Sequence, residues 1–391
     1  KVVPRSEWRF RDAATVELNG GFRAFHWYEL VYCSSHAPVV GAGLLAVRDL
    51  AAHLRRDHDH VFAFGISQSG RFLRQHLYDG LNLDEQGQQV FDGVFSHIAS
   101  ARRGEFNMRY GQPALTHPLT PGYGPPYDTT SLLENQRSLG GVPKVMLTNT
   151  AWEYWRGDGA LVHQDANSGA DLSEDVDARV HLLAGADHLG AVPIKESMPL
   201  ANPAHLLDLS PVVRALFMQV VAWTCDGVDP QPSRVPRHAD GTAVSRSEVL
   251  AGFHEGALPA PASLPWTPAI DSASVTWPLE LGDPLSALVS AVDADGNEVA
   301  GIRLPAIAAA AHAYTGWNPR VHVEGLPDVL YEFGGSQLPR QSGRPLPDRD
   351  SYEATARNAA AALVTDRFLL ERDVERVVDE AMRLYAAAVD A

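Results

Sequence analysis

The chain of 391 residues is 45% hydrophobic and 20% charged, which is typical of a soluble globular protein and excludes a disordered one. Its 48 acidic residues outnumber its 32 basic residues, and the net charge of -16 disfavours binding to nucleic acids. No apolar run approaches the roughly 18 residues that a membrane helix needs, so we expect no membrane span.

The two cysteines, Cys33 and Cys225, are too few for a disulfide framework or a cysteine-ligated zinc site. The sequence alone leaves a single bridge between them open. The chain begins at Lys1 with neither an initiator methionine nor a signal peptide, which we interpret as a processed or trimmed chain. The compartment stays open, because secretion, the periplasm and the cytoplasm all fit, and so does the oligomeric state.

Strand-like and helix-like segments alternate from about residue 14 to residue 190. Runs rich in aromatic, branched or other apolar residues predict strands at 25–32, 61–66, 90–98, 142–149 and 179–184. Apolar residues at helical spacing predict a helix over 41–55, and a second helix follows the strand at 61–66 and ends at Gly80. This order predicts a parallel sheet with helices on both faces, an α/β fold.

The region after the third of these strands is irregular. Residues 101–141 are rich in proline and glycine and predict a long loop, such as a lid or a pocket wall. A helix is predicted at 211–223, with Ser210 as its N-cap and Pro211 at the first helical position. We therefore assign residues 1–227 to an α/β core.

The composition changes after residue 227. Residues 228–285 are rich in proline and alanine and predict a chain that wraps over the surface. A hairpin that turns at Asp295-Gly296 is predicted within 288–304, and a helical tail is predicted over 351–389. We interpret 228–391 as an extension that wraps or caps the core.

A tight strand-to-helix turn is predicted around Ser67, in the pattern small-x-Ser-x-small of a nucleophile elbow. Such a turn lifts the hydroxyl clear of the sheet and brings strand and helix close together, which requires small residues at Gly65 and Ser69. Gly70 adds clearance. The helix begins just after the serine, so the backbone N–H of Gln68 is a natural oxyanion donor.

A serine nucleophile needs a base and an acid that orients the base, and in this fold they follow in the order Ser, acid, His. Glu153 comes just after the strand at 142–149, and His188 comes just after the strand at 179–184. All three side chains therefore fall at the carboxyl ends of parallel strands, where they can converge. We predict a triad of Ser67, Glu153 and His188.

Other residues compete for these roles. Asp158, on the same loop as Glu153, is an alternative acid, and His163 is an alternative base. His97 ends its own strand and could serve as the base or line the pocket. Three aromatic residues could also line an acyl or aromatic pocket: Tyr123, Trp152 and Trp155.

The segment Gly65–Arg74, with the pattern GxSQSGRF, resembles the elbow of a bacterial alpha/beta-hydrolase-domain family whose members are taken to be esterases. Segments at 41–49, 101–107, 153–155, 293–305 and 314–318 also resemble that family, and the chain is distantly similar to glucuronoyl esterases. The resemblance implies an alpha/beta-hydrolase fold and a Ser-Glu-His triad, carried here onto Ser67, Glu153 and His188. Members of the family usually carry a long N-terminal region. Here the early strands, and the loop that supplies the second oxyanion donor, are not evident, so the chain is a fragment or takes that donor from elsewhere.

Two other patterns suit a dinucleotide site and a calcium loop, but each lacks a residue that such a site requires. Gly41 and Gly43 suit dinucleotide binding, but the following strand ends without the acidic residue that holds a ribose. The acidic segment at 293–298 lacks the glycine and glutamate spacing of a calcium loop. We therefore predict no metal and no cofactor.

The predicted function is a serine hydrolase that cleaves small-molecule carboxylic esters through an acyl-serine intermediate. An acyltransferase or a lyase with the same triad is one alternative. A noncatalytic binding module on a hydrolase scaffold is the other.

Overall fold

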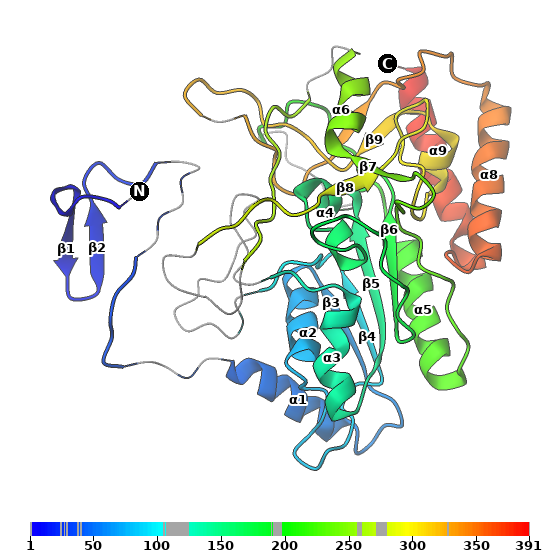
Figure 1. Ribbon diagram of the computed structural model, residues 1–391. Coiled ribbons are helices and arrows are strands. Elements are labelled where there is room, and N and C mark those ends of the chain that lie inside the picture. Colours follow the sequence, from blue (N-terminus) through cyan, green and yellow to red (C-terminus); the bar gives the residue numbers. More distant parts are fainter. Residues whose placement is uncertain are drawn as a thin grey trace.

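A parallel sheet of four strands lies at the centre of the computed structural model (Figure 1). In spatial order the strands are β3 (Phe62–Ile66), β4 (Gly93–His97), β5 (Lys144–Thr150) and β6 (Ala178–Leu183). They confirm the last four predicted strands, with small shifts at the ends. The structure describes residues 2–23, 26, 28, 30–36, 39, 41–104, 106, 125–188, 190, 198–255, 260–270, 280–326 and 328–390.

Helices cover both faces of this sheet, as the alternation of segments predicts. On one face, α1 (Ala42–Leu54), α2 (Gln68–Tyr78) and α3 (Thr129–Leu139) share a buried apolar cluster with Val94 and Val145. On the other face, α5 (Ser210–Asp226) packs against Phe95 and Met146. Consecutive strand residues thus point to opposite helix layers, because side chains alternate along a strand.

The elements beyond residue 227 close over the carboxyl end and one side of the sheet (Figure 1). Two antiparallel pairs form there, β7 (Ala243–Ser245) with β8 (Leu288–Ser290) and β9 (Ala313–Thr315) with β10 (Ser336–Leu338). The helices of this part are α6 (Arg246–Glu255), α7 (Pro305–Ala309), α8 (Arg349–Thr365) and α9 (Val374–Val389). Helices α7, α8 and α9 extend the apolar cluster around α5.

The two edges of the sheet differ. Single parallel bridges join His181 to Arg234 and Leu183 to Ile302, so residues beyond 227 cover the outer edge of β6. Among the described residues, no strand pairs with the outer edge of β3, where Phe64 and Ile66 are 44% and 49% exposed.

The predicted boundary between residues 227 and 228 stays a prediction.

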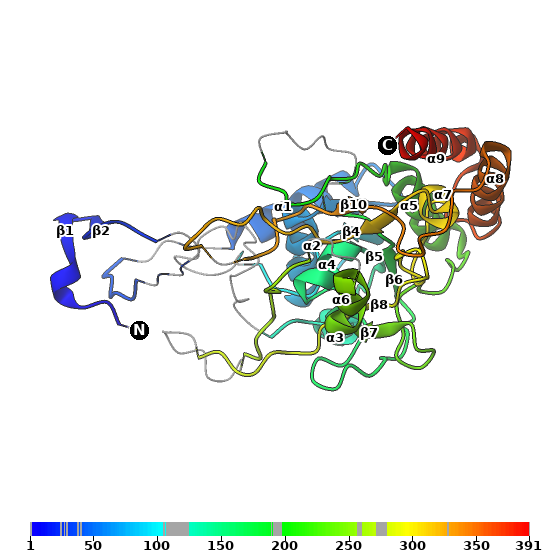
Figure 2. The same ribbon diagram turned by 90° about the horizontal axis from the view of Figure 1, so that it is seen from above.

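The predicted strand at 25–32 is wrong for the residues that can be described. Phe25, Trp27 and Glu29 lie outside the described residues, and the others of this segment form no strand. A strand needs a neighbour to pair its backbone groups, and the described chain provides none beside β3. The N-terminal strands are instead β1 (Trp8–Asp12) and β2 (Thr15–Leu18), a hairpin that lies apart from the sheet in both views (Figures 1 and 2).

Two predicted helix boundaries need correction. The tail at 351–389 is two helices, α8 and α9, which lie side by side in Figure 2 and are separated by a turn in which Arg367 has a φ of 61°. Ser210 lies inside α5, whose N-cap is Leu209, while the Asp208 side chain accepts a hydrogen bond from Ser210 N. Apolar spacing does not fix either detail, because the ends of helices are set by backbone hydrogen bonds and by the residues that cap them.

The regions predicted as loops contain more structure than expected. Helix α3 lies within 101–141, and its N-cap Asp128 accepts a hydrogen bond from Ser131 N at 2.8 Å. Strand β7 and helix α6 lie within 228–285. The predicted hairpin within 288–304 turns at Gly296, which has a φ of 88°, and an antiparallel bridge joins Val292 to Glu298 across it. The short strand β8 before this turn pairs with β7. Cys33 and Cys225 are both exposed and unbridged.

Candidate active site

Ser67 sits at the junction between β3 and α2 in a strained backbone conformation. Its φ of 55° and ψ of -114° are unusual for a residue with a side chain, and its N–H donates to the carbonyl of His97 at 2.9 Å. A Cβ atom at Gly65 would lie 2.6 Å from the Ser69 carbonyl oxygen, and one at Gly70 would lie 2.9 Å from Ser96 Oγ. The small residues of the elbow are therefore required by the close approach of strand and helix.

The first turn of α2 leaves backbone donors beside the serine. The first helical hydrogen bond runs from Arg71 N to the carbonyl of Ser67 at 2.9 Å. The N–H of Gln68 precedes that bond, so it has no partner within the helix. Ser67 itself is partly exposed. The first turn of α2 therefore leaves a backbone donor, the Gln68 N–H, beside Ser67.

The structure brings the imidazole of His188 to the serine. His188 lies on the loop after β6, and its Nε2 is 2.9 Å from Ser67 Oγ. The distance is that of a hydrogen bond. The His188 side chain is only 7% exposed, so the contact lies in a largely water-excluded place.

Glu153 holds the other side of this imidazole. It lies in α4 (Ala151–Arg156), directly after β5, and its Oε1 is 2.5 Å from His188 Nδ1. Its Oε2 accepts hydrogen bonds from Thr150 N at 2.7 Å and Thr150 Oγ1 at 2.6 Å. Burial opposes the charge of this carboxylate, but His188 and the Thr150 hydrogen bonds outweigh it and lower the pKa of Glu153.

The two alternative residues lie elsewhere. Asp158 pairs through both carboxylate oxygens with Arg156, at 2.6 and 2.8 Å; burial opposes its charge, but this partner lowers the pKa of Asp158 to about 2. His163 Nε2 contacts Tyr154 Oη at 2.9 Å, and burial lowers the pKa of His163 to about 3. Within the described part of the chain, neither Asp158 nor His163 forms a hydrogen bond with Ser67 or His188.

The predicted pocket residues divide into two groups. His97 accepts the Ser67 N–H through its carbonyl, and its Nδ1 is 2.7 Å from Thr148 Oγ1; burial lowers the pKa of His97 to about 4. The Trp152 ring lies 5.7 Å from the His188 ring. Trp155 instead packs against Trp317 in an interior cluster, and Tyr123 lies outside the described residues.

Sequence reasoning missed a set of residues that hold the His188 loop from far along the chain. The Phe333 carbonyl accepts the His188 N–H at 3.2 Å, and Glu298 Oε2 accepts the Gly185 N–H at 2.7 Å. Asp187 Oδ2 accepts the N–H of Gly335 at 3.3 Å. The one local signal was the Gly334-Gly335 pair, which marks a tight turn but does not say what that turn contacts.

Backbone strain gathers around Ser67. Ile98 and Ser100, in the loop after β4, have φ values of 50° and 59°. The Ile98 N–H donates to the carbonyl of Thr148 at 2.6 Å, and the Ser100 N–H donates to Asn149 Oδ1 at 2.9 Å. Residues in such conformations persist only where neighbours fix them, and they cluster at functional sites.

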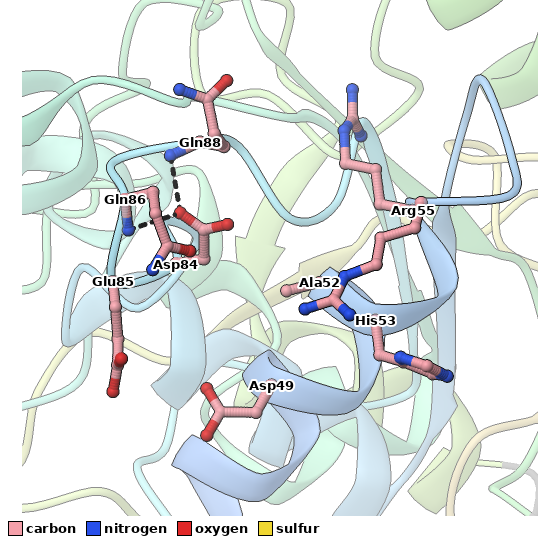
Figure 3. A pocket seen from close by; sticks show the side chains of 9 residues that line it. Asp49, Ala52, His53, Arg55, Asp84, Glu85, Gln86 and Gln88 are labelled. Carbon is pink, nitrogen blue, oxygen red and sulfur yellow. Dashed lines mark hydrogen bonds between the residues drawn. The ribbon is translucent and has the colours of Figure 1, made fainter.

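A surface cavity lies at the other end of the sheet. It has a volume of about 470 Å³ and is lined by Asp49, Ala52, His53, Arg55, Arg56, Asp84, Glu85, Gln86 and Gln88 (Figure 3). Helix α1 and the loop before β4 form its walls, so it lies near the amino ends of the strands. The Ser67 corner lies at their carboxyl ends, where ligands of open α/β sheets bind. Geometry and chemistry therefore favour the Ser67 corner as the candidate active site.

The described residues contain no group of three or more His, Cys, Asp or Glu side chains placed to hold a metal ion. None of the helices in these same ranges is long and apolar enough to cross a membrane.

Comparison with known proteins gives one match. A family model described as an alpha/beta hydrolase domain matches residues 41–379, which is most of the chain. The matched range includes Ser67, Glu153, His188 and the Phe333 loop. No curated protein and no solved structure matches the chain. The similarity to glucuronoyl esterases stays a prediction.

Proposed function

This chain belongs to the alpha/beta hydrolase domain family, and from that premise we propose that it is a serine hydrolase that cleaves carboxylic esters. One observation carries the proposal. A continuous line of contacts runs from Ser67 Oγ to His188 Nε2 at 2.9 Å and from His188 Nδ1 to Glu153 Oε1 at 2.5 Å. This is the arrangement of nucleophile, base and orienting acid that acyl transfer requires.

The first half of the proposed reaction forms an acyl-serine. Ser67 Oγ attacks the ester carbonyl while His188 Nε2 takes the hydroxyl proton, and the carbonyl oxygen becomes an oxyanion near the Gln68 N–H. The tetrahedral intermediate collapses, the C–O bond of the ester breaks, and His188 returns the proton to the leaving alcohol. Glu153 holds the imidazole in the tautomer with Nδ1–H and stabilises its charged form.

The second half releases the acid. A water molecule attacks the acyl-serine carbonyl as His188 takes one of its protons, and collapse of the second tetrahedral intermediate expels Ser67 Oγ. His188 then returns the proton to that oxygen, so the enzyme is regenerated. An alcohol or amine in place of water would give acyl transfer, and the contacts around Ser67 do not discriminate among these acceptors.

The test compares the wild type with Ser67→Ala on p-nitrophenyl esters of graded acyl length. We expect the wild type to hydrolyse at least one ester and kcat to fall at least about a thousandfold in the variant. The fold should survive, because the substitution removes one oxygen from a partly exposed side chain. Undiminished hydrolysis by Ser67→Ala would refute the assignment. A folded wild type that cleaves no ester would favour the acyltransferase, lyase or binding-module alternatives.

A further inference from the structure

Phe333 lies against the face of the His188 imidazole. The centres of the two rings are 4.7 Å apart and their planes are inclined by 31°, which is a tilted arrangement. Trp152 completes a group of three rings, at 5.7 Å from His188 and 5.3 Å from Phe333. Glu153 and Ser67 occupy the two nitrogen atoms of the imidazole, so Phe333 is its neighbour on a ring face.

The backbone at Phe333 is strained. Its φ of 73° is a conformation that residues with bulky side chains rarely adopt. The same residue accepts the His188 N–H through its carbonyl at 3.2 Å. A strained residue therefore contacts His188 twice, through its backbone and through its ring, and such conformations are kept where they serve a function.

The chain on both sides fixes this conformation. The Tyr331 N–H donates to the carbonyl of Asn318 at 2.7 Å, and β10 begins at Ser336 and pairs with β9. Gly335 is pressed against Thr315, because a Cβ atom there would lie 2.3 Å from the Thr315 carbonyl oxygen. The position of Phe333 is thus set by β9, β10 and Asn318, and the His188 loop adds to this framework the bond from the Gly335 N–H to the Asp187 carboxylate.

Few charged groups face the His188 imidazole directly, so an aromatic ring face can contribute to stabilising its positive charge. Glu153 faces it from α4 and carries the negative charge, while His97 faces it from β4 and is neutral near pH 7 because burial lowers its pKa to about 4. Arg156 lies behind Trp152, with its guanidinium 4.8 Å from that ring centre. The Asp187 carboxylate accepts N–H groups of its own loop and of the Phe333 loop, from Gly190 at 2.8 Å and Gly335 at 3.3 Å.

We propose that Phe333 is a positioning residue for His188, which fixes the plane of the imidazole and stabilises its protonated form through the aromatic face. The electron-rich face of a phenyl ring attracts a cation within about 6 Å. During turnover the imidazole becomes charged when it takes the proton of Ser67 or of water. The attraction is therefore stronger in the transition state than in the resting enzyme, and it raises kcat.

The kinetic test uses Phe333→Leu, Phe333→Tyr and the control Tyr331→Leu. Leucine keeps apolar bulk but removes the aromatic face, so we expect kcat to fall about threefold to tenfold with little change in KM. The acid limb of the pH profile should move to lower pH, because a less stabilised imidazolium loses its proton more readily. Phe333→Tyr should behave like the wild type. Tyr331→Leu removes a ring from the same loop that contacts Arg320 rather than His188, and should move neither quantity.

The catalytic part of this inference rests on the proposed function, but the ring contact can be measured without turnover. NMR of protein with 13C-labelled histidine, assigned with His188→Gln, follows protonation of His188 directly. We expect its titration midpoint to fall in Phe333→Leu and to stay in Tyr331→Leu. If the wild type cleaves no ester, this result still decides whether Phe333 supports the charged imidazole.

A further change at position 333 keeps the test decisive if Phe333→Leu does not fold. Incorporation of pentafluorophenylalanine at position 333 keeps the shape of the ring but reverses the charge distribution of its face. We expect this protein to stay folded and to show a lower titration midpoint for His188 than the wild type. An unchanged midpoint in this protein, or in folded Phe333→Leu, would overturn the proposal.

Discussion

The elbow around Ser67 and the loop around His188 reach the same corner in different ways. The elbow is built from neighbours in sequence, because Gly65, Ser69 and Gly70 together allow β3 and α2 to approach. The His188 loop is held from outside, by Glu298 at Gly185 and by Phe333 at His188 itself. A strand-to-helix elbow can thus be recognised from a short pattern, whereas the support of the His188 loop depends on residues that only folding brings near.

We expect the largest effect from removing the contact between the Glu153 carboxylate and the His188 imidazole. In Glu153→Gln an amide replaces the carboxylate, so the imidazole loses its charged partner and can adopt the wrong tautomer. We expect kcat to fall about 10³- to 10⁴-fold, as measured by ester hydrolysis, with an unchanged circular dichroism spectrum. A loss of less than tenfold would show that Glu153 does not orient the base.

Asp158 provides the matched contrast to Glu153, since it lies close in sequence but pairs with Arg156. Asp158→Asn leaves the buried guanidinium of Arg156 without its charged partner. We expect the free energy of unfolding to fall by about 3–5 kcal/mol in urea titrations. The folded fraction should retain most of its kcat. A folded Asp158→Asn protein with wild-type stability and no activity would instead make Asp158 the catalytic acid.

The contact between Glu298 and Gly185 N–H supports the His188 loop from far along the chain, and we expect it to depend on pH. Burial raises the pKa of Glu298 from 4.5 to about 7. Between these values the folded protein keeps a proton that the unfolded chain releases, so the stability contributed by this group is full below pH 4.5 and is lost as pH rises through 7. Glu298→Gln keeps an acceptor for Gly185 N and removes this dependence.

We therefore expect Glu298→Gln to match the wild type near pH 4 and to exceed its free energy of unfolding by up to about 3 kcal/mol above pH 7. Urea titrations at several pH values would measure this difference. Parallel curves for the two proteins across that range would contradict the expected titration of Glu298. The effect concerns stability, so kcat near neutral pH should change little.

The sequence predicted most of the parallel sheet and the three residues that meet in the candidate site. Buried parallel strands consist of short apolar runs, so β3, β4, β5 and β6 were visible without any neighbour being known. The order of Ser67, Glu153 and His188 then followed from where each lies after its strand. These features depend on local composition and on a shared topology.

Features that depend on contacts between distant parts of the chain were not predictable in the same way. The run at 25–32 has the composition of a strand, but its described residues have no strand to pair with. The break between α8 and α9 depends on a turn at Arg367 that the apolar spacing does not mark. Phe333 touches His188 only because β9, β10 and the Gly335 contact place it there. Each of these needs knowledge of chain packing.

The central claim is that Ser67 is a nucleophile activated by His188, and covalent labelling tests it most directly. A fluorophosphonate probe should react with the folded wild type, and peptide mass spectrometry should place the adduct on Ser67. Ser67→Ala should not react, and His188→Ala should react far more slowly, because the serine has lost its base. A folded wild type that stays unlabelled, or an adduct on another residue, would contradict the account.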